Sequence, residues 1–273
     1  MSIKLIAIDI DGTLLNSQHQ LTNEVKETLK KAEEKGVKIV LCTGRPLTGV
    51  QDLIAELDLY SDNDYVVTYN GSLIQKTKTK EVVSKFELSH EDYLAIDGLA
   101  RKLNIHLHTE TEDTMFTSNR DISRYTVLES HLVNMPLKYR TQEEMTEDLT
   151  IIKMMMIDEP ELLDQAITLI PEEFYERYTI VKSTPYFLEF LNKKVDKGAA
   201  IHLLATHLGI EASEVMALGD NENDLPMIQY AGLGIAMGNA TENVKNAASF
   251  ITTSNDEHGV AVAIEKFVLK SLS

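Results

Sequence analysis

Cysteine is nearly absent from the 273-residue sequence, and its single copy, Cys42, excludes an intramolecular disulfide. Cys42 stands in the apolar stretch VKIVLCTG, which is typical of a small buried side chain rather than a reactive thiol. Long apolar runs are also missing, because none approaches the roughly 20 residues that a membrane-spanning helix needs. The run at residues 3–8 is too short for a signal-peptide core. We therefore expect a cytoplasmic protein that does not enter a membrane.

Basic residues are scarce as well. There are 26 lysines and arginines against 43 aspartates and glutamates, which gives a net charge of −17. Nucleic acids are bound through basic surfaces, so this balance argues against a nucleic-acid partner. A small anionic substrate is still compatible with the charge, provided that a metal ion or a few placed basic residues attract it.

The two ends of the chain alternate between strand-like and helix-like stretches. Apolar, strand-like stretches occupy residues 3–10, 37–44 and 65–71, and helix-like stretches occupy residues 21–36 and 46–59. The same rhythm returns between residues 198 and 270. Strands that alternate with helices predict a parallel sheet with helical crossovers, which is an α/β fold with a Rossmann-like core.

The middle of the chain has more polar alternation, which favours an α+β sheet with one exposed face. We interpret it as a second domain inserted into the first. The predicted core comprises residues 1–82 and 190–273, and the predicted insertion comprises residues 83–189.

Polar residues follow several predicted strands of the core. They are Asp9 and Asp11 after the first strand, Thr43, Gly44 and Arg45 after the second, Asn70 and Gly71 after the third, and Gly219, Asp220, Asn223 and Asp224 after a late strand. Open parallel sheets form their sites at the carboxyl ends of the strands. We therefore expect these groups to meet at one edge of the sheet.

Asp9, Asp11 and Asp220 would repel one another in such a cluster unless a cation or a proton intervened. Hard oxygen ligands without histidine or cysteine suit Mg²⁺. Each short motif has a simpler explanation on its own. An Asp-x-Asp after a strand is often a turn, and DNENDL at 220–225 lacks the glycine and the distal glutamate of an EF-hand calcium loop. The combination of motifs favours the magnesium site.

The motifs DIDGTLL, CTGRP, YNG, KKVDKG and GDNENDLPM resemble, in this order, the motifs of the haloacid dehalogenase-like superfamily. The inserted segment resembles the large α/β cap of its Cof-type, class IIB members, which include bacterial sugar phosphatases. This resemblance implies a Rossmann-like core with a cap domain that selects the substrate.

The resemblance also implies roles for the acidic residues. Asp9 would be the nucleophile that forms an aspartyl-phosphate. Asp11 would be the general acid and base, and its backbone carbonyl would be a metal ligand. Asp9 and Asp220 would bind Mg²⁺ through their carboxylates, and Asp224 would order the metal shell.

The resemblance assigns phosphate binding to Gly12, Thr43, Gly44, Lys197 and Asn223. For Arg45 two roles stay open, which are phosphate binding and holding the loop in place beside a carboxylate. Lys197 would place a positive charge on the transferring phosphoryl group and would therefore also be catalytic. We read Lys193 and Lys194 as surface residues. In the cap, His106, His108, Glu110, Arg120 and Tyr125 are weaker candidates for contacts to the leaving group, because each is more simply explained as a surface or packing residue.

These assignments imply a Mg²⁺-dependent phosphatase for small phosphorylated metabolites, with sugar phosphates as the expected class. The alternatives are a phosphotransferase or phosphomutase of the same superfamily, or a non-enzymatic phospho-acceptor module. A binding protein on a degenerate hydrolase scaffold is less favoured, because every expected catalytic residue type is present. We expect a monomer or a weak homo-oligomer.

Overall fold

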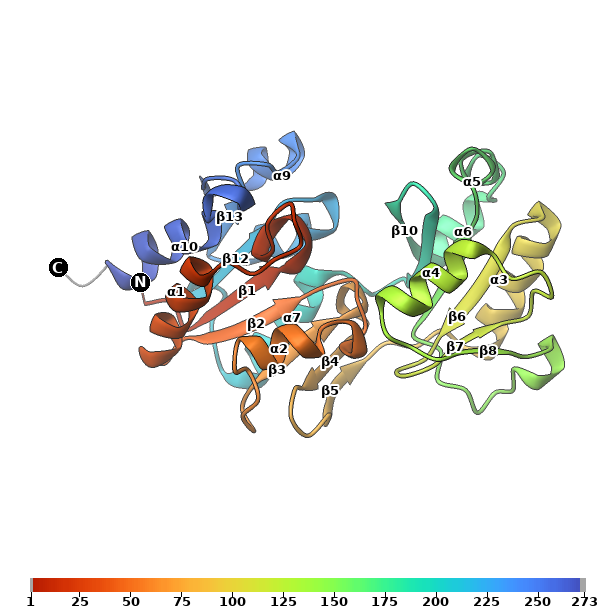
Figure 1. Ribbon diagram of the computed structural model, residues 1–273, viewed down its shortest axis with the longest axis horizontal. Helices are drawn as coiled ribbons and strands as arrows, with labels where there is room; N and C mark the ends of the chain where they lie inside the picture. Colours follow the sequence, from red (N-terminus) through yellow and green to blue (C-terminus); the bar gives the residue numbers. More distant parts are fainter. Residues whose placement is uncertain (1, 271–273) are drawn as a thin grey trace. The chain divides into compact units, whose positions relative to one another are not determined.

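The computed structural model describes residues 2–270 and divides into two compact units (Figure 1). The first unit contains the described residues up to Gly44, Asp52–Ser84 and those from Asp196 onward, and the second contains Arg45–Gln51 and Lys85–Val195. Residues 45–51 thus lie outside the unit to which we assigned them. They join the second unit because the Thr48 hydroxyl donates to the Val133 carbonyl at 2.7 Å.

The first unit is built on an eight-stranded sheet with the order β14-β13-β12-β1-β2-β3-β4-β5. Its strands are β1 (Leu5–Asp9), β2 (Lys38–Cys42), β3 (Tyr65–Thr68), β4 (Leu73–Lys76), β5 (Val82–Lys85), β12 (Val215–Gly219), β13 (Leu233–Ala236) and β14 (Phe250–Ile251). The strands from β14 to β3 pair in parallel, and β4 pairs antiparallel to β3. The predicted parallel sheet is confirmed. The stretch EVVSKFEL, which we placed in the insertion, begins instead with the edge strand β5 of this sheet.

Helices cover both faces of this sheet. They are α1 (Asn23–Glu34), α2 (Gln51–Glu56), α7 (Lys197–Leu208), α8 (Leu225–Tyr230), α9 (Glu242–Ala247) and α10 (Gly259–Ile264). One face, with Leu5 and Ala7 of β1, packs against Ile201 and Leu204 of α7. The helices α1 and α10 lie side by side on the other face (Figure 1). The helix expected over residues 46–59 is shorter, because a single 3₁₀ turn precedes α2.

Local sequence signals explain where the two longest helices of this unit begin and end. The Thr22 side chain accepts a hydrogen bond from the backbone N–H of Val25 and caps α1, and the Asp196 side chain caps α7 through Ala199. Gly36 follows α1 and Gly209 follows α7, with φ of 84° and 67°. Glycine adopts this left-handed conformation without steric cost, so both helices end there.

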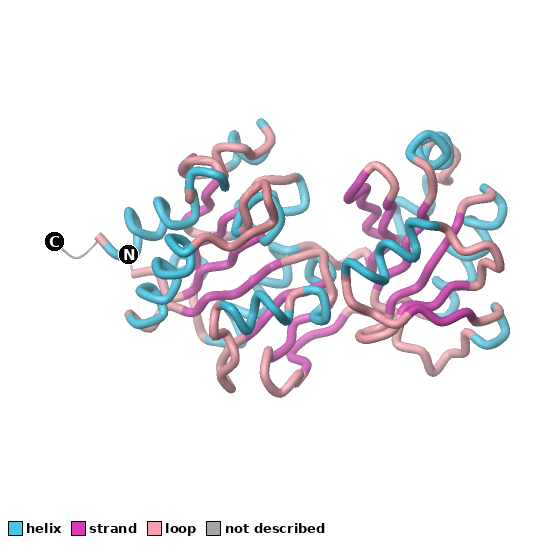
Figure 2. Tube along the Cα trace, in the orientation of Figure 1, coloured by secondary structure: helices cyan, strands magenta, loops and turns pink. Residues whose placement is uncertain are grey.

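The second unit contains a six-stranded sheet with the order β10-β11-β9-β6-β7-β8. Figure 2 draws the strands of both units in magenta and the helices in cyan. Its elements are α3 (His90–Leu103), β6 (His106–Glu110), β7 (Met115–Thr117), α4 (Arg124–Leu132), β8 (Leu137–Tyr139), β9 (Lys153–Ile157), α5 (Pro160–Ile167), α6 (Glu172–Arg177), β10 (Tyr178–Thr184) and β11 (Phe187–Asn192). One face of the sheet, with Met154 and Met156, forms a core with Ile96 of α3 and Leu163 of α5.

Our expectation of an exposed face on this second sheet is wrong where the sheet carries charge. His108, Glu110, Lys153 and Glu189 alternate with the core residues, yet each is buried. They pair with one another, although the buried His108 Nδ1 and Glu110 Oε2 atoms have no hydrogen-bond partner among the described residues. The His108 Nε2 atom lies 3.1 Å from Glu110 Oε1, and the Lys153 Nζ atom lies 3.5 Å from Glu110 Oε1 and 3.7 Å from Glu189 Oε2.

Within residues 2–270, no helix combines the length and the apolar character that crossing a bilayer requires.

Candidate active site

The acidic site begins where β1 ends. Asp9 is the last residue of β1, and β1 lies between β12 and β2, which run parallel to it. Asp220 directly follows β12, and Thr43 directly follows β2. Because parallel neighbours end at the same edge of a sheet, these residues are brought together although they are far apart in sequence.

Three carboxylates converge at this edge. One oxygen each of Asp9, Asp220 and Asp224 lies within 4.8 Å of the others. Asp224 uses both of its oxygens within the protein. Its Oδ2 atom accepts from the backbone N–H groups of Asp220 and Asn221, both at 3.0 Å, and its Oδ1 atom accepts from Lys197 at 2.6 Å. Asp224 is therefore well placed to orient the loop and the lysine.

Lys197 supplies the positive charge of the cluster. It is the first residue of α7, it is fully buried, and its Nζ atom donates to Asp9 Oδ1 at 2.5 Å. A helix N-terminus is an unfavourable place for a cation, and burial alone would lower the pKa of Lys197. The charges of Asp224 and Asp9 outweigh this effect and raise that pKa above its usual range. Lys197 is therefore held charged between two carboxylates.

One ammonium group does not balance three carboxylates. Burial, with repulsion from Asp224, raises the pKa of Asp9 well above its usual value, although Lys197 opposes the rise. Burial raises the pKa of Asp220 to about 6 despite the hydrogen bond that it receives from Thr13. The ionised cluster is thus short of positive charge. Clustered carboxylate oxygens are the ligands that Mg²⁺ prefers, so the residues present fit that ion.

The turn after β1 makes close contact with Asp220. Gly12 has a φ of 82°, and a Cβ atom at this position would lie 2.5 Å from Asp220 Oδ2. The Thr13 hydroxyl donates to Asp220 Oδ1 at 2.8 Å. Glycine is needed here for both its conformation and its size. We did not predict Thr13; its place directly after the glycine of the IDGTL stretch is the only signal in the sequence.

Asp11 differs from the other acidic residues of the site in its exposure. Its side chain is 45% exposed, and its Oδ1 atom lies 3.9 Å from the Nδ1 atom of His19. The converging side-chain oxygens come from Asp9, Asp220 and Asp224. The Asp11 carboxylate can thus be reached by water, while its backbone belongs to the same turn as Gly12.

The predicted phosphate-binding residues of the core lie along the neighbouring strand ends. Thr43 is buried, and its backbone carbonyl accepts from the N–H of Asn70 at 2.9 Å. The Asn223 side-chain amide donates to Asn70 Oδ1 at 3.0 Å. A Cβ atom on Gly44 would lie 3.1 Å from the Asn70 amide nitrogen. Asn70 therefore connects the segment after β2 with the segment after β12.

The remaining candidates belong to the second unit. Arg45 belongs to it with residues 46–51. Arg120 is exposed. His106 contacts Asp158 at 2.8 Å, and the Tyr125 hydroxyl donates to Glu159 at 3.0 Å. His108 and Glu110 belong to the buried charged cluster of this unit. A role in substrate binding stays a prediction for all of these residues.

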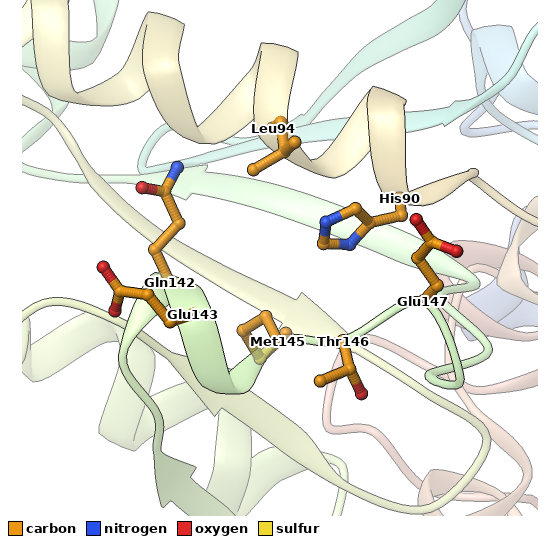
Figure 3. A pocket seen from close by; sticks show the side chains of 7 residues that line it. All are labelled: His90, Leu94, Gln142, Glu143, Met145, Thr146 and Glu147. Atoms are coloured by element: carbon orange, nitrogen blue, oxygen red, sulfur yellow. The ribbon is translucent and has the colours of Figure 1, made fainter.

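A surface hollow of the second unit has a volume of about 380 Å³ (Figure 3). It is lined by His90, Leu94, Gln142, Glu143, Met145, Thr146 and Glu147. None of these lining residues is among the predicted site residues, so the hollow lends no support to the site proposed at the core sheet.

Comparison with known proteins identifies relatives over the whole chain. The sequence profile of the haloacid dehalogenase-like hydrolases matches residues 6–264. A putative phosphatase of Bacillus subtilis, YxeH, is 50% identical over 266 residues, which cover 97% of this chain and 98% of the relative.

Solved structures agree with this result. A haloacid dehalogenase-like hydrolase from Bacteroides thetaiotaomicron has a TM-score of 0.87 and 33% identity, covering 97% of this chain and 99% of the other. The subclass IIB sugar phosphatase BT4131 has a TM-score of 0.77 and 27% identity, covering 97% of this chain and 98% of the other.

Proposed function

Because the chain belongs to the haloacid dehalogenase-like hydrolase family, we propose that it is a Mg²⁺-dependent phosphatase of small phosphorylated metabolites. Sugar phosphates are the proposed substrate class, since one of its structural relatives is named a sugar phosphatase. The observation that carries the proposal is the convergence of Asp9, Asp220 and Asp224 around the buried Lys197.

Asp9 is the proposed nucleophile. Its carboxylate oxygen attacks phosphorus and forms an aspartyl-phosphate while the bond to the leaving oxygen breaks. The 2.5 Å contact with Lys197 supports this role, because a neighbouring cation favours the ionised carboxylate that attacks. The same ammonium is near enough to the Asp9 oxygens to stabilise charge on the phosphoryl group as it transfers.

Asp11 is the proposed general acid and base. It gives its proton to the leaving oxygen and then takes a proton from the water whose oxygen attacks the aspartyl-phosphate. Inorganic phosphate leaves, and both aspartates return to their starting states. The partial exposure of the Asp11 side chain supports this role, because both the leaving group and the water must reach it.

Mg²⁺ would be held by the carboxylates of Asp9 and Asp220 and by the backbone carbonyl of Asp11. Asp224 would orient this site through its hydrogen bonds to Lys197 and to the Asp220 backbone. When bound, Mg²⁺ neutralises negative charge on the carboxylates and on the phosphoryl group. The remaining residues proposed to bind phosphate are Gly12, Thr43, Gly44, Arg45 and Asn223.

The test is phosphate release from a panel of sugar phosphates and other phosphomonoesters in the presence of Mg²⁺. We expect release from some of them, and we expect EDTA to abolish it. The variant Asp9→Asn should release phosphate roughly 10⁴-fold more slowly, and a rapidly quenched reaction of the wild-type protein should contain phosphorylated protein. Release that Asp9→Asn leaves unchanged would refute the covalent mechanism.

Product analysis separates the remaining alternatives. A phosphomutase would convert a sugar phosphate into an isomer without releasing phosphate, and a phosphotransferase would phosphorylate an added hydroxyl acceptor. A phospho-acceptor module would stay phosphorylated after one turnover. Inorganic phosphate that accumulates over many turnovers supports the phosphatase, and each of the other three results contradicts it.

A further inference from the structure

One loop of the first unit hydrogen-bonds to both acidic segments of the site. The loop follows β13 and contains Asn239 and Thr241. The Asn239 side-chain amide donates to the Gly12 carbonyl at 2.8 Å, in the turn after β1. The Thr241 backbone N–H donates to the Asp220 carbonyl at 2.9 Å, directly after β12. This loop, which we call the β13 loop (residues 237–241), therefore connects the Asp9–Asp11 segment with the Asp220 segment.

Asn239 is itself held in place by a second asparagine. Its Oδ1 atom accepts from the backbone N–H of Asn255 at 3.0 Å. The side-chain amide of Asn255 donates to the Leu15 carbonyl at 2.9 Å. The two amides thus hold the carbonyls of Gly12 and Leu15, which lie on either side of Thr13. Thr13 in turn donates to Asp220.

The turn that receives these bonds departs from regular structure. Asp11 has φ and ψ of −84° and 116°, Gly12 has 82° and −2°, and a backbone bond from Leu15 to Ile10 closes the turn at 3.0 Å. Such a turn is not fixed by sheet pairing beyond Asp9. Contacts from outside the turn therefore decide where the Asp11 backbone lies relative to Asp220.

We propose that Asn239 is a positioning residue, which sets the spacing between the Asp11–Gly12 turn and Asp220 and thereby the affinity of the site for a divalent cation. This inference rests on the proposed function in one respect, which is that a divalent cation binds at Asp9, Asp220 and the Asp11 carbonyl. Asn239 acts through the Gly12 carbonyl, and it needs no contact with substrate for this role.

The test is direct Mn²⁺ binding, measured by electron paramagnetic resonance, to the wild-type protein, to Asn239→Leu and to Asn243→Leu. Asn243 is the matched control. It is also exposed and lies just beyond the β13 loop, but its amide contacts the Glu222 side chain at 3.2 Å. Losing one hydrogen bond corresponds to about a threefold to tenfold weaker Mn²⁺ affinity for Asn239→Leu. We expect no change for Asn243→Leu.

Steady-state kinetics supply a second readout on the same proteins. We expect kcat of Asn239→Leu to fall while KM for the phosphorylated substrate stays within about twofold. Asn255→Leu tests the same chain of bonds if Asn239→Leu does not fold, and it should weaken Mn²⁺ binding in the same direction. If Asn239→Leu binds Mn²⁺ with the same affinity as Asn243→Leu, the inference is overturned. Absence of phosphate release by the wild-type protein would overturn the proposed function instead, and the binding data would still decide the role of Asn239.

Discussion

The ammonium group of Lys197 contacts the carboxylate of Asp9 at 2.5 Å, although 188 residues separate the two in the chain. The same group contacts Asp224 at 2.6 Å. Lys197 is fully buried, so it compensates the charge of two carboxylates in a place that water does not reach. The charge balance at this edge of the sheet therefore depends on the same three side chains to which we assign the proposed chemistry.

Replacing Lys197 with methionine should destabilise the protein strongly in metal-free buffer. The change leaves Asp9 and Asp224 buried without their cation, and removing one partner of a buried ion pair typically costs about 3–5 kcal/mol. Chemical denaturation in EDTA measures this loss. Saturating Mg²⁺ should recover part of it, because the ion supplies the missing positive charge.

The control is Lys194→Met, which removes an exposed lysine from the segment just before α7. Its free energy of unfolding should stay within about 0.5 kcal/mol of the wild-type value. An equal effect of the two substitutions would contradict the compensating role of Lys197.

Replacing Asp9 with asparagine should lower kcat by roughly 10⁴-fold while the protein stays folded. The amide keeps the size of the side chain but has no oxygen that can attack phosphorus. Because burial and Asp224 raise the pKa of Asp9, removing its charge should also raise Tm in metal-free buffer. Phosphate release and calorimetry on the same preparation check both expectations. A lower Tm would show that the ionised Asp9 stabilises the fold.

Much of the first unit could be predicted from the sequence. The apolar stretch that ends in Asp9 and the capped helix α1 have local signals that tertiary contacts do not override. The parallel sheet and the α/β class follow from the alternation of such elements, and both are confirmed. The convergence of Asp9 and Asp220 could be anticipated because neighbouring parallel strands end at one edge. The roles assigned to these residues stay predictions.

The second unit shows why the rest could not be predicted. We missed α4, whose buried side chains, Thr126 and Glu129, are polar, so the helix has no apolar stripe to reveal it. His108 and Glu110 lie on one face of β6, and two such polar side chains indicate an exposed face. Both are buried, however, beside Lys153 and Glu189 of other strands, and Lys153 forms ion pairs with Glu110 and Glu189. Pairings of this kind depend on sheet register, which a single sequence does not contain.

Glu129 should make the stability of the protein depend on pH. Burial raises its pKa to about 7, although Lys153 and Arg45 oppose the rise. An unfolded glutamate has an ordinary pKa near 4.5. Between these values the folded chain holds a proton that the unfolded chain has lost, so stability falls as pH rises from about 4.5 to 7. The loss contributed by this residue is about 3 kcal/mol at pH 8.

The variant Glu129→Gln removes this charge and should therefore raise Tm at pH 8 but have little effect at pH 5. The other charged groups that act on Glu129 include Glu110, Glu189 and Lys153. Because the wild-type protein and the variant both retain them, the difference in Tm reports on the carboxyl group of Glu129. Glu173→Gln, at an exposed position of the same unit, is the control. A Tm difference that does not change between pH 5 and pH 8 would rule out the proposed titration.

Replacing Gly12 with alanine should damage the metal site more than the same change at Gly36. Both glycines have a φ above 80°, so alanine strains the backbone at either position by about 1 kcal/mol or more. Space is the difference between them, because a Cβ atom at Gly12 would lie 2.5 Å from Asp220 Oδ2, whereas nothing lies within 4 Å at Gly36. We therefore expect backbone strain to lower Tm by a similar amount in Gly12→Ala and Gly36→Ala. Only Gly12→Ala should also lose Mn²⁺ affinity and kcat. Equal Mn²⁺ affinities in the two variants would mean that the Asp220 carboxylate can move aside without harm to the site.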